Sequence, residues 1–111
     1  MKNQFIEHLL ELLEPFGAVT ARRMFGGTGL FHNGLMFAIV MDELLYLKAD
    51  DENRTEFESR GLQRFTYKKQ GKEVSLSYYE APAEAVENSA EMRKWAEFAY
   101  EAAVRAVKKR P

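Results

Sequence analysis

The stretch Arg22–Phe31 is Arg-Arg-Met-Phe-Gly-Gly-Thr-Gly-Leu-Phe, with three glycines within four positions between two runs of bulky residues. Glycine loses more backbone entropy on folding than other residues, so such a cluster inside a domain needs a reason. The usual reasons are a turn or bulge with positive φ angles, or the close approach of another backbone or a ligand. Because two arginines lead into the cluster, this stretch is the first candidate for a site.

Strand patterns flank the glycine cluster on both sides. Residues Val19–Phe25 precede it and favour a strand, in which successive side chains point to opposite faces. After it, Asn33-Gly34 separates Gly29–His32 from Leu35–Met41. Asn-Gly between apolar runs is the strongest short-range hairpin signal, because both residues tolerate positive φ. Leu35–Met41 is apolar at every position, which predicts a central strand buried on both faces.

The rest of the chain adds helices near both ends and a second hairpin. The patterns predict a helix over about Asn3–Glu14 and a strand over Leu44–Lys48. They then predict a short helix, capped by Asp50 or Asp51 and closed by Gly61, followed by strands over Phe65–Lys68 and Glu73–Tyr79. A helical turn is expected after Pro82, and then a long helix that is capped by Asn88 and carries an apolar stripe from Met92 to Val107.

The resulting order is helix, strand meander, helix, hairpin and long C-terminal helix. All but one of the strand connections have hairpin length, so the sheet should be antiparallel. We therefore expect one α+β domain over residues 1–111, with helices packed on an antiparallel sheet of about five to six strands.

The composition is that of a small globular protein. The chain has 111 residues, no cysteine and a formal net charge of −1, so it contains no disulfide or thiolate site, and no overall field attracts it to nucleic acid. The N-terminus lacks the basic and apolar regions of a signal peptide. The longest apolar run, Leu35–Met41, is far shorter than the ~20 residues that span a bilayer. We expect a cytoplasmic protein with no membrane contact.

A phosphate-binding loop is one interpretation of the glycine cluster. Such loops leave a strand and open a helix, whose N-terminal amides hold the anion. Here a hairpin follows the glycines, and His32 stands where the third glycine of a dinucleotide fingerprint would fall. The pattern therefore favours a bulge or sharp bend between two strands, in which the glycines serve the fold.

Arg22 and Arg23 are the candidate partner contacts beside this bend. On a strand they point to opposite faces, so one arginine can pair with a carboxylate of the fold while the other meets solvent. As a pair they could instead contact a phosphate or an acidic partner surface. A pocket near these arginines and the Gly26–Gly29 turn would make the chain a binding domain or enzyme for a small anionic molecule, which is the first alternative function.

The sequence contains no constellation that predicts catalysis, a metal or a cofactor. The two histidines, His8 and His32, have no second ligand at metal-binding spacing. The serines lack the context of a nucleophile elbow. We therefore expect no catalytic residue, no metal ligand and no cofactor, and a protein that is not an enzyme.

A basic patch makes direct nucleic-acid binding a second alternative function. Its members are Arg64, Lys68, Lys69 and Lys72. The aromatic residues Phe65 and Tyr67 interleave with them, and a sheet that presents aromatics and lysines can bind nucleic acid. The sequence lacks an RNA-recognition consensus, and acids such as Glu73 lie close by, which weakens this alternative.

Taken together, the motifs resemble the N-terminal domain of the TfoX/Sxy family of competence regulators. The resemblance rests on Arg23–Phe31, Gly34–Ala38, Leu45–Lys48, Phe65–Tyr67, Ser77–Pro82, and Trp95 with its alanine-rich helix. The family-motif residues expected to be structural are Met24, Phe25, Gly26, Gly27, Gly29, Lys48, Tyr78, Tyr79, Pro82 and Trp95. The motifs follow in order over nearly the whole chain, and their combination is specific.

The resemblance implies a function that the residues alone do not. Domains of this family are small α+β units with an antiparallel sheet, and no catalytic residues are attached to the family motif. The best-known members activate DNA-uptake genes together with a cyclic-AMP receptor type activator. Full-length members carry a second domain with helix-hairpin-helix character, whereas this chain ends at Pro111, so we expect either a stand-alone single-domain member or the isolated first domain of a longer protein.

The first functional hypothesis is thus a non-enzymatic regulatory domain that works through protein contacts. Its expected partner is the transcription machinery or a cyclic-AMP receptor type activator, with Arg22 or Arg23 at the contact. Apolar residues left exposed on the strand meander would favour a homodimer.

Overall fold

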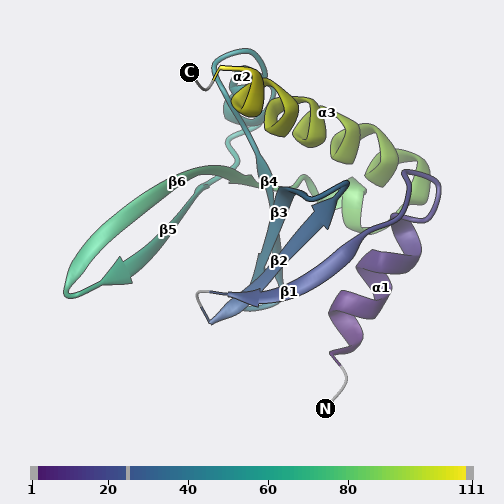
Figure 1. The fold of residues 1–111 in the computed structure, drawn as a ribbon, viewed down its shortest axis with the longest axis horizontal. Helices are drawn as coiled ribbons and strands as arrows, with labels where there is room; N and C mark the ends of the chain where they lie inside the picture. The colour runs from purple at the N-terminus through teal and green to yellow at the C-terminus, as the bar shows by residue number, and fades with distance from the viewer. Residues whose placement is uncertain (1–2, 25, 110–111) are drawn as a thin grey trace.

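The computed structural model describes residues 3–24 and 26–109, which form one six-stranded sheet with helices packed on it. In chain order the elements are α1 (Gln4–Leu12), β1 (Thr20–Met24), β2 (Gly27–His32), β3 (Leu35–Met41), β4 (Leu44–Lys48), α2 (Arg54–Glu58), β5 (Arg64–Lys69), β6 (Lys72–Glu80), the 3-10 helix η1 (Ala83–Val86) and α3 (Ser89–Lys108) (Figure 1). The predicted α+β class, antiparallel sheet and element order are confirmed. Phe25, predicted to end the first strand, lies outside the described residues.

Tight turns with positive φ connect the strands of each hairpin. Asn33 and Gly34, between β2 and β3, have φ angles of 50° and 79°, the left-handed values that a type I′ turn requires. The pairs Asp42-Glu43 and Gln70-Gly71 also have positive φ at both positions. The Asn-Gly hairpin prediction is confirmed, and β1 to β4 form a meander of neighbouring strands.

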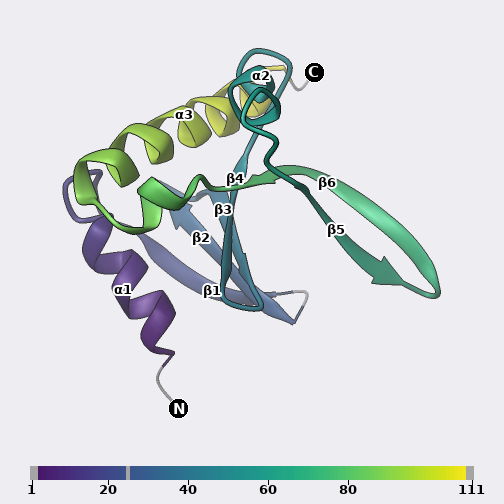
Figure 2. The ribbon, with the colours of Figure 1, turned by 180° about the vertical axis from the view of Figure 1, so that it is seen from behind.

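The second hairpin joins the sheet through its later strand. The strand order is β1-β2-β3-β4-β6-β5, so β3 is an interior strand, as its all-apolar sequence predicts. Only the end of β6 pairs with β4, from Tyr78 opposite Lys48 to Glu80 opposite Tyr46. The remainder of β6 pairs with β5 alone and extends away from the body in both views (Figures 1 and 2). We call this projecting hairpin the β5–β6 arm.

A bulge in β3 turns two adjacent side chains to the same face. Leu30 pairs with Ala38, whereas the next residue of β2 pairs with Met36, so Phe37 is the extra residue in β3. Phe37 and Ala38 are both 0% exposed in the main core, while Ile39 belongs to a separate cluster. The bulge breaks the strict alternation of the strand and gives the helix-covered face a second large side chain.

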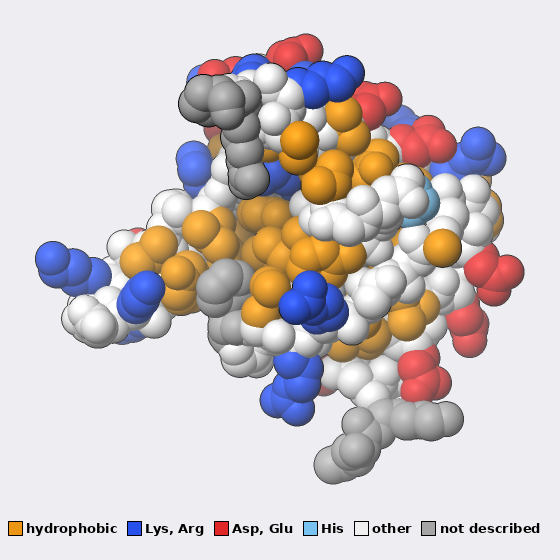
Figure 3. Space-filling view, viewed as in Figure 1, with side chains coloured by type: hydrophobic (Ala, Val, Ile, Leu, Met, Phe, Trp, Pro, Cys, Tyr) orange, Lys and Arg blue, Asp and Glu red, His pale blue; other side chains and the backbone are white. Residues whose placement is uncertain are grey.

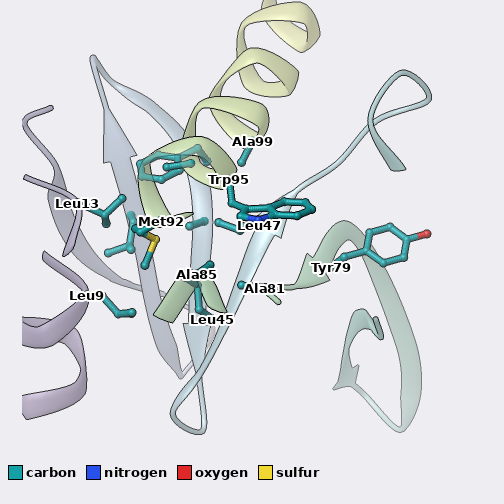
Figure 4. Close-up of a cluster of buried hydrophobic side chains, with 14 of the residues drawn as sticks. Leu9, Leu13, Leu45, Leu47, Tyr79, Ala81, Ala85, Met92, Trp95 and Ala99 are labelled. Atoms are coloured by element: carbon teal, nitrogen blue, oxygen red, sulfur yellow. The ribbon is translucent and has the colours of Figure 1, made fainter. Parts of the chain in front are cut away.

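The helices cover one face of the sheet and close the main core. α3 packs on β3 and β4, and α1 packs on α3. Leucines from α1, β4 and the segment after α1 meet Met92, Trp95 and Ala99 of α3 in this core (Figure 4). Within the described ranges, no helix is long and apolar enough to cross a membrane.

Side-chain caps fix where the two long helices begin. The Oδ1 atom of Asn3 accepts hydrogen bonds from the first amides of α1. In α3, Asn88 Oδ1 accepts from Ala90 N–H at 2.8 Å and Glu91 N–H at 3.1 Å. These bonds satisfy amides that have no partner inside a helix, and the predicted Asn88 cap is confirmed.

Two local predictions are wrong. α2 begins after Asn53, without a side-chain cap, whereas the carboxylate of Asp50 accepts from the amides of Glu52 and Asn53 in the preceding turn. Val107, predicted to continue the apolar stripe of α3, is 45% exposed. It borders a hollow beside the sheet rather than packing on a strand, since α3 has passed the main core by its last turn.

Candidate functional site

The glycines after β1 allow three strands to pack closely. Gly26, with φ of 78°, lies between β1 and β2, and β2 follows it directly. A Cβ atom on Gly27 would lie 2.4 Å from the carbonyl oxygen of Val40, and one on Gly29 would lie 2.7 Å from Met36 Sδ. Since a strand follows the turn, no helix N-terminus is present there to hold a phosphate.

Arg22 and Arg23, both exposed, lie on opposite faces of edge strand β1. The guanidinium of Arg22 lies 5.3 Å from the centroid of the Phe31 ring, a cation–π contact. Arg23 lines a hollow of about 400 Å³ that also includes Ala21, Gly27 and residues of α1. The two arginines therefore do not converge on one ligand or one partner surface.

The hollow at Arg23 has a mixed charge. Its lining includes Asp42 and Glu43 of the β3–β4 turn, together with Asn3 and Ile6 at the start of α1. The two carboxylates oppose the field of the arginine that a small anion would need. This lining disfavours the anionic-ligand alternative.

The predicted basic patch is divided along the β5–β6 arm. Lys69 and Lys72 are paired across the two strands next to the turn, and Lys68 lies opposite Glu73. Arg64 lies at the base of the arm, where its Nε donates to a backbone carbonyl of β6 at 3.1 Å. Lys and Arg side chains gather at the end of the arm (Figure 3), so three of the four patch residues remain neighbours.

Two family-motif aromatics hold α2 against the main core. Trp95 packs on Phe57 with ring centroids 5.4 Å apart, and the guanidinium of Arg60 lies 5.0 Å from the Trp95 ring. The hydroxyl of Tyr79 donates to the Glu58 carboxylate, and this hydrogen bond raises the pKa of Tyr79. Their contacts are those of structural residues.

The remaining motif residues lie at the ends and edges of the strands. Pro82 is buried and lies directly before η1 at its N-cap position, as predicted for a proline that opens a helical turn. Met24 is partly buried at the end of β1. Lys48 and Tyr78 are paired between β4 and β6, and the Lys48 ammonium lies 5.1 Å from the centroid of the Tyr78 ring.

Both histidines have hydrogen-bond partners in the fold. His32 Nδ1 donates to the Ala18 carbonyl at 2.6 Å, and its ring contacts Phe16 and Tyr100 at centroid distances of 4.7 and 4.8 Å. His8 Nε2 donates to the Val86 carbonyl at 2.8 Å. In the part of the chain that the structure describes, no group of three histidine or acidic side chains is arranged to hold a metal ion.

An ion pair connects the end of α3 to the loop before α2. Arg105 donates to the two carboxylate oxygens of Asp50 at 2.7 and 2.9 Å, and this contact lowers the pKa of Asp50. Beside it, the buried side chain of Asn53 donates to the Phe98 carbonyl at 3.2 Å. These groups fix the position of α3 and are partnered within the fold.

The face of the sheet opposite the helices carries a second apolar cluster, which we call the open face. Its members are Ile39, Phe65 and Tyr78 at the buried centre, with Met36, Met41, Tyr46, Tyr67 and Leu76 partly buried around them. Among the described residues, none from α1, α2 or α3 belongs to this cluster. Hydrophobic side chains are visible over this region, between the arm and the meander (Figure 3).

The centre of the open face is ordered by packing between the arm and the meander. The rings of Tyr46 and Phe65 meet edge to face with centroids 4.9 Å apart. The Tyr78 hydroxyl donates to the Met36 carbonyl at 3.4 Å, and burial raises the pKa of Tyr78 to about 12. The centre of the open face is therefore buried, whereas the apolar side chains around it are only partly buried.

Sequence reasoning did not identify the open face as a site. A signal was present, because β3 is apolar throughout and the apolar residues of β5 and β6 alternate toward one side. The pattern alone could not show that the helices all pack on the other side. That information depends on how distant segments are arranged.

Comparison with known proteins identifies the family of this chain. The chain matches the family of the TfoX N-terminal domain over residues 11–103. It is 32% identical to the DNA transformation protein TfoX1 of Aliivibrio fischeri (strain ATCC 700601 / ES114) over 74 residues, which are 67% of this chain and 35% of that protein. It is 28% identical to Protein Sxy of Escherichia coli (strain K12) over 95 residues, 86% of this chain and 46% of that protein. The chain spans less than half the length of these two relatives.

Proposed function

Since the chain belongs to the TfoX N-terminal domain family, we propose that it is a non-enzymatic domain that regulates DNA-uptake genes by binding a partner protein. The name of its relative TfoX1, a DNA transformation protein, supports the regulated process. The partner implied by the family resemblance is a cyclic-AMP receptor type activator or another part of the transcription machinery. The proposed place of action is the cytoplasm, where such a partner acts.

The observation that carries this proposal is the open face. Met36, Met41 and Leu76 at its periphery are only partly buried, although they belong to an apolar cluster. Removing such surface from water contributes roughly 25 cal/mol per Å². Methionine and aromatic side chains are enriched in protein interfaces, whereas nucleic-acid interfaces are more polar and strongly basic. The face therefore fits a protein partner better than a nucleic acid.

The test is a binding measurement with purified proteins. The chain is immobilised, and the cyclic-AMP receptor protein and RNA polymerase of Escherichia coli are passed over it with and without cyclic AMP. We expect binding to at least one of them, weakened about tenfold or more by Met36→Asp and by Leu76→Asp, because each places a charge on the apolar periphery.

A matched control separates binding from folding. Ala90→Asp places the same carboxylate on an exposed position in the first turn of α3, where the helix dipole favours it. This variant should bind like the wild type, and circular dichroism should show all three variants folded. Absence of binding to both proteins, or binding that Met36→Asp and Leu76→Asp leave unchanged, would contradict the proposal.

A further inference from the structure

Two cations lie against aromatic rings, one at the centre of the open face and one beside it. Arg22 lies over Phe31, which is paired with Met36 of the open face. Lys48 lies over Tyr78, which is at its centre. Paired residues of neighbouring strands share a face, so both cations border the apolar surface.

The tip of the arm adds two further cations on the same side. Tyr67 belongs to the open face and is paired with Val74, while Lys69 is paired with Lys72 two residues nearer the turn. Residues two apart along a strand point to the same side. Lys69 and Lys72 therefore extend the open face toward the tip of the arm.

Two acids act on Tyr46 of the open face. Glu80 is paired with Tyr46, and Glu80 and Asp42 add to the effect of burial in raising the pKa of Tyr46. Among the described residues, the strand pairings place four cations on the open face, Arg22, Lys48, Lys69 and Lys72, against one acid, Glu80, while Asp42 lies in the adjoining β3–β4 turn. The open face is thus apolar in the middle, and positive over most of its border.

A hollow of about 240 Å³ lies where the last turns of α3 approach the open face. Its lining includes Met36 and Tyr78 of the open face and Ala103, Ala106 and Val107 of α3. Val107 is 45% exposed there. Lys48 also lines this hollow, so it combines apolar side chains with a positive charge and suits a large hydrophobic side chain that has acidic neighbours in sequence.

We infer that the open face binds an amphipathic acidic helix of the partner protein. Its apolar side chains would cover the periphery of the open face and fill the hollow beside Val107, while its carboxylates would meet the cations of the border. This inference rests on the proposed function and adds the chemistry of the partner. Helices bind grooves through apolar residues at i, i+3, i+4 and i+7, which leaves their flanks for charge pairing.

Charge favours an acidic helix on the open face over a second copy of the chain or a nucleic acid. A second copy of the chain would bring a mainly positive border against a mainly positive border, which opposes association. A nucleic acid would meet an apolar centre and the acids Asp42 and Glu80, although it would suit the lysines of the arm. An acidic amphipathic helix satisfies both the apolar centre and the positive border.

The probe is a pair of synthetic helical peptides with capped ends. Both carry leucine and phenylalanine at i, i+3, i+4 and i+7; one has glutamate on the flanks of this stripe and the other has lysine at the same positions. Fluorescence anisotropy measures their binding to the full chain. We expect the glutamate peptide to bind about tenfold or more tightly than the lysine peptide, with an affinity that falls as salt is added.

A charge exchange makes the test specific to the open face. In the double variant Lys69→Glu/Lys72→Glu, the preference should reverse, with weaker binding of the glutamate peptide and stronger binding of the lysine peptide. The control is Arg54→Glu/Lys94→Glu, which makes the same change of charge on α2 and α3 and should keep the original preference. Leu76→Asp should weaken both peptides.

Three results would overturn the inference. One is equal binding of the two peptides, or binding of neither; another is a preference that the arm variant leaves unchanged. The third is loss of the bound glutamate peptide to a competitor. Either the chain associates with itself, which sedimentation would show as a concentration-dependent dimer, or duplex DNA displaces the peptide. If the peptides fail while the activator or polymerase binds and Met36→Asp prevents it, the proposed function stands and only the acidic helix is excluded.

Discussion

Gly27→Ala should destabilise the domain far more than Gly29→Ala, although both glycines lie in β2 and both are crowded. A Cβ atom at position 27 would lie 2.4 Å from the Val40 carbonyl oxygen, an atom of the backbone of β3. Because real Cβ contacts do not fall below 3.0 Å, the strands must separate locally by at least 0.6 Å, the difference between the two distances. At position 29 the two closest atoms are the sulfurs of Met36 and Met24, which are ends of flexible side chains.

The magnitudes follow from what has to move. Overpacking against a fixed backbone costs about 1–3 kcal/mol, and weakening a neighbouring ladder hydrogen bond adds about 1 kcal/mol. For Gly27→Ala we therefore expect a loss of about 2–4 kcal/mol of unfolding free energy, and a fall in Tm on the order of 10 °C. Gly29→Ala should change the unfolding free energy by less than about 1 kcal/mol, because methionine side chains can move aside and alanine reduces the entropy of the unfolded chain.

Urea unfolding measures both variants with one probe. Trp95 is the only tryptophan and is 1% exposed in the main core, so its fluorescence reports global unfolding. The denaturant slope should stay constant if both variants unfold in two states. The reasoning fails if Gly27→Ala is within about 0.5 kcal/mol of the wild type, or if Gly29→Ala is the more destabilising of the two.

Three further perturbations test the core, a cap and an ion pair. Phe37→Ala should cost about 3–5 kcal/mol in the same urea assay, because it empties a site that is 0% exposed. Asn88→Ala should cost about 1 kcal/mol by removing the cap of α3, whereas Asn88→Ser should retain most of it. Arg105 lowers the pKa of Asp50 in the folded state. The stabilisation from the ionised carboxylate is therefore fully present above the pKa that Asp50 has in the unfolded chain, and it is lost as the pH falls through the lower pKa of the folded state. Asp50→Asn should cost about 1–3 kcal/mol at pH 7 and flatten the decline in stability below about pH 4, measured by urea unfolding across pH.

The features that sequence predicts well here are encoded within a few residues. Asn33-Gly34 carries its positive φ angles in its own side chains, and Asn88 lies two residues before an amide that it caps. Such signals act before distant parts of the chain meet, so they can be recognised without knowledge of the fold. Together with the apolar pattern of each segment, these signals predict the type and order of the elements.

The features that sequence does not predict depend on residues far apart. The choice of β6 rather than β5 as the neighbour of β4 rests on pairs such as Leu47 with Tyr79. The bulge at Phe37 is settled by how β3 fits between β2 and the helices. In the same way, the separate surroundings of Arg22 and Arg23 depend on Phe31 and on the β3–β4 turn, which the local pattern around the arginines does not contain.

The two faces of β3 bear on the proposed binding role of the open face. Ala38 and Val40 pack in the helix-covered core, and Ile39 is equally buried on the other face by residues of the arm. Burial of Ile39 alone would allow polar residues around it, since an antiparallel sheet with one solvated face normally alternates apolar and polar side chains. Met36 and Met41 are apolar and only partly buried beside it. They contribute less to the core than Ile39 while remaining accessible to a partner, so substitutions there should change binding more than folding, which is the distinction that the Met36→Asp experiment measures.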